Sequence, residues 1–357
     1  MNARVKALGK SISAFADAAL IFSEVSRFYF TGFPATDGCL LVTPAQSVFY
    51  TDSRYTEAAE KKIGAQFVRN SKELYKELAE FFAANNIKKV ALENDRLTLA
   101  QYEELCAKLP GIDFCTTDAL SKAIEAIRIV KTEDEVEKIV KAQRIAERAF
   151  DHILGFIKPG KTEKEIRLEL EYFMLSHGAD DLSFETIAVT GVKTSMPHGV
   201  PGDNVVKNGD FVTMDYGALV EGYHSDMTRT VAVGDITDEQ KKVYATVLEA
   251  QKCGLNALHD GISGVDADKA ARDVIEAAGY GANFGHGTGH GVGVEIHEAP
   301  TLSPRSAHTL RPGHIVTVEP GIYLPDRFGV RIEDMALITD TGCRILTDCP
   351  KELIILK

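Results

Sequence analysis

Short apolar runs alternate with helical stretches through the first third of the chain. The runs GCLLVTP, SVFYTD, QFVR and KKVALE have the composition of strands. The stretches between them, at 54–63, 71–85 and 99–109, have the pattern of helices. Short strands alternating with helices predict a small α/β domain. We interpret the mildly hydrophobic N-terminus as an amphipathic helix and not a signal peptide, because Asp17 interrupts its apolar part.

Beyond this region the chain becomes helical, and two further helix starts are marked by capping residues. Thr132 is a good N-cap and is followed by acidic residues in the first turn of a long helix. Thr162 caps the next helix in the same way. We place the domain boundary near Ala123, which gives residues 1–123 and 124–357 as the two domains.

The second domain alternates between helical and β-rich segments. A β-rich block covers 186–233, helices are predicted over 237–258 and 265–278, and hairpins follow from 297 to the end. The order of helices followed by hairpins occurs twice in this domain. This order predicts an antiparallel sheet that is covered by helices on one side. This is an α+β arrangement.

Composition is that of a globular protein and narrows the possible partners. The 357 residues are 45% hydrophobic, and the length favours two domains. The net charge of −12 argues against a nucleic-acid partner, and no apolar run reaches the ~20 residues of a membrane span. Six cysteines without a CxxC pair suit reduced thiols and the cytoplasm. All ten histidines lie between His152 and His314, so any histidine chemistry belongs to the second domain.

The segment FVTMDYGALVEGYHSDMTRTVAV has the pattern of a hairpin that carries two acids. A turn centred on Val220 and Glu221 places Asp215 directly opposite Asp226, with Cβ atoms ~5 Å apart. Two carboxylates at that distance repel each other, and a cation between them reverses the effect. The alternative is a pair of solvated carboxylates on an exposed sheet face.

The segment VTVEPGIYLPDRFGVRIEDMAL is a second hairpin-like pair. Glu319 lies in a strand so apolar that an unpaired carboxylate would be costly. Arg331 and Glu333 are two residues apart, so their side chains point to one face. The alternative for these two is a surface ion pair, which would stabilise the fold little.

The stretch FGHGTGHGVGVEIHEAP holds His286, His290 and His297 among closely spaced glycines. Glycine is costly to order, so its density indicates that backbone passes very close to something. One imidazole among four carboxylates forms an oxygen-rich site, which favours hard divalent ions such as Mn²⁺, with Co²⁺ and Zn²⁺ as competitors. Four negative charges suit two such ions ~3.5–4 Å apart. Spacing alone leaves open which histidine binds metal.

Together these segments resemble the pita-bread metallopeptidases, the family of methionine aminopeptidase, aminopeptidase P and prolidase. The matching stretches MDYGA, HSDMTRT, GHGTGHGVG, VTVEPGIY and RIED occur in the family's order. The resemblance implies a pita-bread fold for the second domain and five metal ligands: Asp215, Asp226, His290, Glu319 and Glu333. All five ligand types are present, which argues against the members that lost their metals and act as creatinases or binding proteins.

The Xaa-Pro branch of the family is the most similar. SMPHG around His198 and VRIED resemble its motifs, and RFYFTGFPATDG with FYTDSRYTEAA resembles the creatinase-type N-terminal domain. The resemblance implies two-metal hydrolysis of the bond before proline by a homodimer. We expect Glu319 to shuttle a proton, and His198 and His297 to stabilise the oxyanion. His286 and Arg331 are expected to support the site or contact substrate.

Two activities remain open within this branch. A prolidase cleaves dipeptides and must recognise the free carboxylate of proline, whereas aminopeptidase P acts on longer peptides and must leave that side open. Arg305, in SPRSAHTLRPG, lies where the resemblance implies a carboxylate-binding arginine, and an ordinary loop arginine is the alternative. We favour the dipeptidase, with aminopeptidase P as the alternative and a metal-free binding protein of this fold as the rival from another class.

Overall fold

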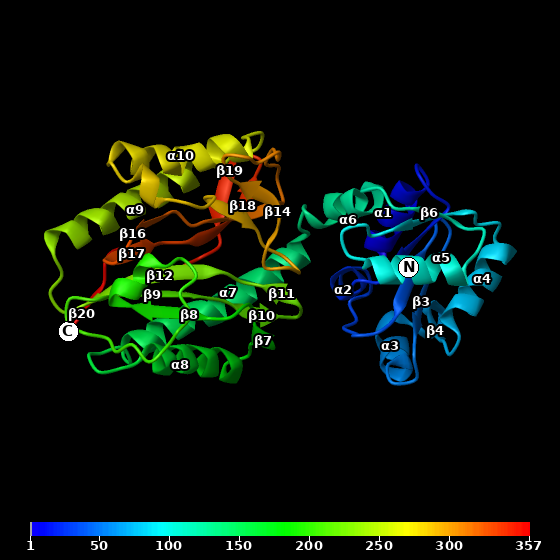
Figure 1. Ribbon diagram of the computed structural model, residues 1–357, viewed down its shortest axis with the longest axis horizontal. Coiled ribbons are helices and arrows are strands. Elements are labelled where there is room, and N and C mark those ends of the chain that lie inside the picture. The colour runs from blue at the N-terminus through cyan, green and yellow to red at the C-terminus, as the bar shows by residue number, and fades with distance from the viewer. Residues whose placement is uncertain (1) are drawn as a thin grey trace. The chain divides into compact units, whose positions relative to one another are not determined.

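The computed structural model describes residues 2–357, which form two compact units (Figure 1). The first unit ends at Arg128 and the second begins at Ile129. Ala123, where we placed the boundary, lies inside helix α6 (Ala119–Arg128), so the units divide after that helix ends. In the part of the chain that the structure describes, no helix is long and apolar enough to cross a membrane.

The first unit is built on a six-stranded sheet with the order β4-β3-β2-β1-β5-β6. Its strands are β1 (Ala18–Ile21), β2 (Cys39–Val42), β3 (Ser47–Thr51), β4 (Val68–Asn70), β5 (Lys89–Leu92) and β6 (Asp113–Cys115). Its other helices are α1 (Ala3–Ile12), α2 (Glu24–Thr31), α3 (Thr56–Ile63), α4 (Leu74–Ala84) and α5 (Leu99–Lys108). The four predicted strands and three predicted helices are all present, which confirms the α/β class of this unit.

The prediction that the N-terminus forms one helix is wrong. Helix α1 ends at Ile12, and β1 follows as a central strand that pairs with β2 and β5. All four residues of β1 are fully buried. Asp17 lies between these two elements. Its carboxylate accepts the backbone N–H groups of Lys88 and Lys89 at 2.8 Å.

The second unit combines four long helices with small, mostly antiparallel sheets. The helices are α7 (Glu133–Leu154), α8 (Glu163–Ser176), α9 (Asp238–Ala257) and α10 (Gly264–Ala277). The strands are β7 (Asp181–Leu182), β8 (Ile187–Thr190), β9 (Phe211–Tyr216), β10 (Ala218–Val220), β11 (Tyr223–His224), β12 (Met227–Val233), β13 (Gly289–Gly291), β14 (Glu298–Leu302), β15 (Ile315–Val318), β16 (Gly321–Leu324), β17 (Phe328–Arg331), β18 (Asp334–Thr339), β19 (Gly342–Ile345) and β20 (Ile355–Leu356). The predicted caps Thr132 and Thr162 each form a complete capping box.

The strands of the second unit lie between two pairs of helices (Figure 1). Helices α7 and α8 share a core with the sheet ordered β20-β12-β9-β8, where Phe150 and Leu170 pack with Val212 and Met214. Helices α9 and α10 share a second core with β16 and β17. A further sheet, ordered β14-β13-β15-β18-β19, completes the unit. These layers confirm the predicted α+β class, but the helices cover the strands from two sides and not from one.

The predicted register of the first hairpin is wrong by two residues. Asp215 pairs with Thr228 and not with Asp226. The turn is centred on Glu221 and Gly222, whose φ angles are 51° and 76°. Two-residue hairpin turns need positive φ at both central positions, which the β-branched Val220 resists. A shift of two residues keeps every side chain on its predicted face, so Asp226 lies diagonally across from Asp215.

Candidate active site

A cavity of about 640 Å³ in the second unit collects nearly all of the predicted site residues. Its lining includes Asp215, Asp226, His290, Glu319 and Glu333, together with His198, His286, His297 and Arg331. Arg305 is exposed and is not part of this lining.

The four acids reach the cavity from breaks or edges of strands. Asp215 lies in β9, and Asp226 immediately precedes β12. Val318 pairs with Asp334 where β15 meets β18, and Gly321 pairs with Arg331 where β16 meets β17. Glu319 and Glu333 therefore lie in the short gaps where two long strands pass from one sheet to the other, opposite each other in the register.

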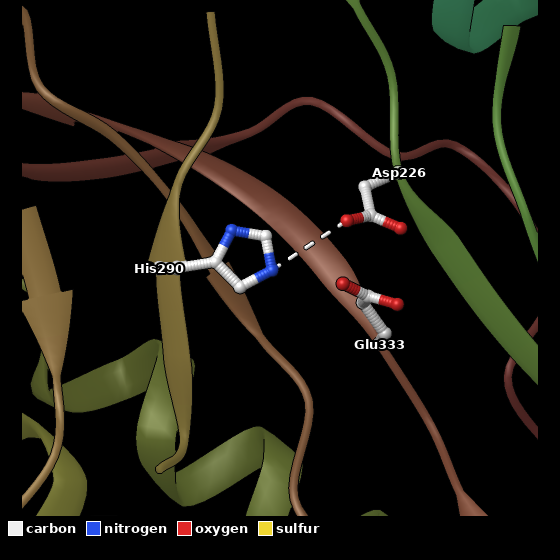
Figure 2. Close-up of side chains that lie close together, drawn as sticks. All are labelled: Asp226, His290 and Glu333. Carbon is white, nitrogen blue, oxygen red and sulfur yellow. Dashed lines mark ion pairs between the residues drawn. The ribbon is translucent and has the colours of Figure 1, made fainter. Parts of the chain in front are cut away.

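Three of the predicted ligands converge on one point. Asp226, His290 and Glu333 each offer an atom, and these atoms all lie within 4.8 Å of one another (Figure 2). The imidazole of His290 faces the two carboxylates, with its Nε2 3.6 Å from Oδ2 of Asp226. Its Nδ1 is 3.1 Å from the carbonyl oxygen of Gly291, which can only accept a hydrogen bond. A neutral ring, the form that binds a metal ion, would carry its proton on Nδ1 and present the Nε2 lone pair to the cavity. In the metal-free site burial acts to lower the pKa of His290, but the hydrogen bond and charge of Glu319 outweigh burial and raise it, which favours the ring protonated on both nitrogens.

The acids have unused acceptor capacity. Oδ1 of Asp215 and Oε1 of Glu333 are buried without a hydrogen-bond partner among residues 2–357. The second oxygen of Glu333 accepts from the Thr228 hydroxyl at 2.7 Å. Burial, reinforced by the neighbouring carboxylates, raises the pKa of Asp226 and of Glu333 well above the ordinary range. A divalent cation would occupy the unused lone pairs and offset the repulsion, so these residues fit such an ion.

Glu319 differs from the other acids in its protonation. Its Oε1 lies 3.3 Å from Nε2 of His290 and 3.2 Å from the hydroxyl of Thr317. Burial acts to raise its pKa, but the hydrogen bond and charge of His290 outweigh burial and lower the pKa to about 2. Glu319 is therefore ionised, which is the form that can take up a proton.

A hydrogen-bonded chain links the remaining polar groups. Arg331 donates to Oδ2 of Asp215 at 2.6 Å and to the Tyr323 hydroxyl at 2.9 Å. The same hydroxyl lies 2.9 Å from Nε2 of His286, whose Nδ1 faces the Gly287 carbonyl oxygen at 2.8 Å. The interpretation of Arg331 and Glu333 as a surface pair is wrong, since both are buried and Arg331 pairs with Asp215.

The other two histidines lie at different depths. The ring of His297 meets that of His290 edge-on, with centroids 4.3 Å apart. Burial, together with the charge of His290, lowers the pKa of His297. His198 is exposed, on the loop between β8 and β9.

The glycines of the histidine-rich stretch let strands approach each other. A Cβ atom on Gly289 would lie 1.9 Å from the carbonyl oxygen of Thr317, and one on Gly291 would lie 2.3 Å from that of Ala299. Contacts this short are impossible, so β13 fits between β14 and β15 only without side chains at these positions. The close approach that the glycines indicated is therefore that of β13 to the backbone of its two neighbouring strands.

Several lining residues carry no sequence signal. Phe184, Ile187 and Ile296 provide apolar wall, and Arg167 of α8 adds a guanidinium. Arg167 lies in a helix that was predicted correctly, but no motif marks it. Its place at the cavity depends on how α8 packs against β8.

Comparison with known proteins agrees with this geometry. Residues 137–340 match metallopeptidase family M24, and residues 4–130 match the creatinase/prolidase N-terminal domain. A Xaa-Pro dipeptidase of Pyrococcus horikoshii is 37% identical over 340 residues, which cover 95% of this chain and 94% of that protein. The structure of a Xaa-Pro dipeptidase from Bacillus anthracis is 42% identical, with a TM-score of 0.95 over 99% of each chain.

A second similar structure is that of a protein with a different activity. The X-Pro aminopeptidase from Thermotoga maritima is 37% identical, with a TM-score of 0.90 over 97% of this chain and 99% of that one. The M24 match spans more than half of the chain and includes every residue of the acid and histidine cluster. The chain therefore belongs to metallopeptidase family M24, a family that uses divalent metal ions, and is a peptidase.

Proposed function

We propose that the protein hydrolyses the peptide bond before proline in dipeptides. The observation that carries this proposal is the meeting of four carboxylates and one imidazole in a single cavity. Two of the buried carboxylate oxygens have no hydrogen-bond partner within residues 2–357. The relatives described as Xaa-Pro dipeptidases, at 37% and 42% identity, support the choice of substrate.

We propose two divalent ions, with Mn²⁺ favoured over Co²⁺ and Zn²⁺ because oxygen ligands dominate. The residues that would hold them are Asp215, Asp226, His290, Glu319 and Glu333. When bound, such ions polarise the scissile carbonyl and make water a stronger nucleophile.

The chain's own residues supply proton transfer and charge stabilisation. The amide before proline has no N–H, so the peptidase gains nothing from pairing with that group. Glu319, ionised in this arrangement, takes a proton from the attacking water and delivers it to the leaving proline nitrogen. His198 and His297 line the cavity and donate hydrogen bonds to the oxyanion. Arg331 orients Asp215 by holding its Oδ2.

Aminopeptidase P activity is the second candidate. It is favoured by the Thermotoga maritima relative and by the position of Arg305 outside the cavity lining. The two candidates are separated by the rates of cleavage of a Xaa-Pro dipeptide and of the matching Xaa-Pro-Yaa tripeptide. The proposal expects kcat/KM to be much higher for the dipeptide. A preference for the tripeptide would replace it with the aminopeptidase. A cytoplasmic homodimer stays a prediction from the sequence.

A further inference from the structure

We propose that Glu163 is a positioning residue that fixes the loop carrying His198. This loop, residues 191–202, joins β8 to the segment before β9 and is called the His198 loop below. The inference rests on the proposed function only in that His198 is taken to contact substrate.

The carboxylate of Glu163 ties the two ends of the His198 loop together. Its Oε1 accepts the backbone N–H of Thr190 at 3.0 Å, immediately before the loop. Its Oε2 accepts the backbone N–H of Gly202 at 2.8 Å, at the end of the loop. The ammonium of Lys193, within the loop, lies 2.8 Å from the same Oε2. One side chain therefore contacts the start, the interior and the end of the loop.

The burial of Glu163 calls for an explanation that helix formation does not supply. Its side chain is 0% exposed, and burying a carboxylate is costly unless donors surround it. The start of α8 is already satisfied by the capping box between Thr162 and Glu165. The three shortest side-chain contacts of Glu163 are made to the His198 loop or to Thr190 before it, and a longer one of 3.4 Å is made to the Asn204 amide just beyond the loop. The buried carboxylate of Glu163 therefore stabilises the position of the His198 loop.

The loop has little apolar packing of its own to keep it in place. Val192, Met196 and Val200 are all exposed, with Val200 at 70%. The first half is held to β17 by the Thr194 hydroxyl, which accepts from the Gly329 N–H at 2.8 Å. The half after His198 is held at Gly202, whose carbonyl oxygen accepts the Lys164 N–H at 3.1 Å and whose own N–H donates to the Glu163 carboxylate. Loss of the bond between Gly202 and Glu163 is expected to let the imidazole of His198 occupy a wider range of positions.

A matched control is available between the same two segments. Lys164 of α8 pairs with Asp203, just beyond the loop, at 2.9 Å. These side chains are 52% and 87% exposed, so their pair contributes little. Asp203→Asn removes a charge from the same region without touching the buried carboxylate.

The first measurement is hydrogen exchange of peptides covering 190–202 in Glu163→Gln, with Asp203→Asn as control. Glutamine keeps the size of the side chain but loses the charge and one acceptor. We expect faster exchange in Glu163→Gln and wild-type exchange in the control. Lys193→Met, which removes a partly exposed partner, gives a smaller change and covers the case in which Glu163→Gln does not fold. Wild-type exchange in both Glu163→Gln and Lys193→Met would overturn the inference.

The second measurement is a double-mutant cycle with His198→Ala. We expect Glu163→Gln to lower kcat about 10- to 100-fold, as a small displacement of a catalytic group does. The same substitution should have almost no further effect in the His198→Ala background. Independent, multiplicative losses would overturn the positioning role. Full activity of His198→Ala alone would contradict the proposed role of His198, while the exchange experiment would still decide whether Glu163 holds the loop.

Discussion

The guanidinium of Arg331 holds one oxygen of Asp215 and leaves the other free. Nη2 of Arg331 lies 2.6 Å from Oδ2, while Oδ1 is buried and has no hydrogen-bond partner among the residues described. Arg331 also contacts Tyr323 and Thr228, so its plane is fixed from three sides. The carboxylate is thereby oriented with its unused lone pairs toward the cavity.

Arg331→Lys is expected to lower kcat/KM or metal affinity about 10- to 100-fold, because lysine cannot reproduce the planar fork that makes these contacts. Steady-state kinetics with a Xaa-Pro dipeptide and calorimetric metal titration measure both effects. Wild-type values for both would show that Asp215 needs no such support.

Asp226→Asn is expected to abolish activity and reduce bound metal while the fold stays intact. The substitution removes a ligand charge from a cluster whose acids repel one another in the absence of a cation. Elemental analysis, activity and circular dichroism on one preparation test this. Full activity with normal metal content would remove Asp226 from the site.

Metal binding is expected to release protons and to stabilise the protein more as pH rises. The pKa values of Asp226 and Glu333 are raised by burial and by neighbouring acids, so stability of the metal-free protein is lost as pH rises through these pKa values. A bound cation removes that penalty. The increase in Tm on adding Mn²⁺ should therefore grow between about pH 5 and pH 8, where ordinary carboxyl groups with a pKa near 4 no longer titrate. An increase that is constant with pH would contradict the raised pKa values.

The sequence predicts features that depend on neighbouring residues better than features that depend on contacts between distant segments. The capping boxes at Thr132 and Thr162 depend on residues three apart, so both helix starts were predictable. The hairpin register depended on which residues accept positive φ, and the prediction paired Glu221 with Val220 where the structure pairs it with Gly222. Glu163 and Arg167 lie in a correctly predicted helix, but their roles depend on which loop and cavity that helix meets.

The proposed metal ligands could be picked out from the sequence for another reason. The acids lie in conspicuously apolar or paired strand patterns, which marked them as candidates for a shared site. Pattern alone did not separate His290 from His286 and His297, and only the family resemblance made that choice. The structure places Nε2 of His290 toward Asp226 and Glu333, and its role as a metal ligand stays a proposal.

Two alanine variants test whether Arg167 or Arg305 binds the carboxylate of a dipeptide substrate. Arg167 lines the cavity, whereas Arg305 is exposed outside the lining. We expect Arg167→Ala to raise KM for a Xaa-Pro dipeptide about tenfold or more, the cost of losing a charged hydrogen bond. Arg305→Ala should change little. A KM increase confined to Arg305→Ala, and to dipeptides, would instead support the carboxylate-binding role that the sequence suggested for Arg305.

The central claim is that the acid and histidine cluster binds divalent ions that the hydrolysis of Xaa-Pro bonds requires. The most direct measurement strips the protein with a chelator and titrates Mn²⁺ back, while metal content and dipeptide hydrolysis are followed on the same samples. The account predicts no hydrolysis by the stripped protein and recovery that parallels the binding of two ions per chain, with neither recovered in Asp226→Asn. Undiminished hydrolysis by protein whose metal content is near zero would contradict it.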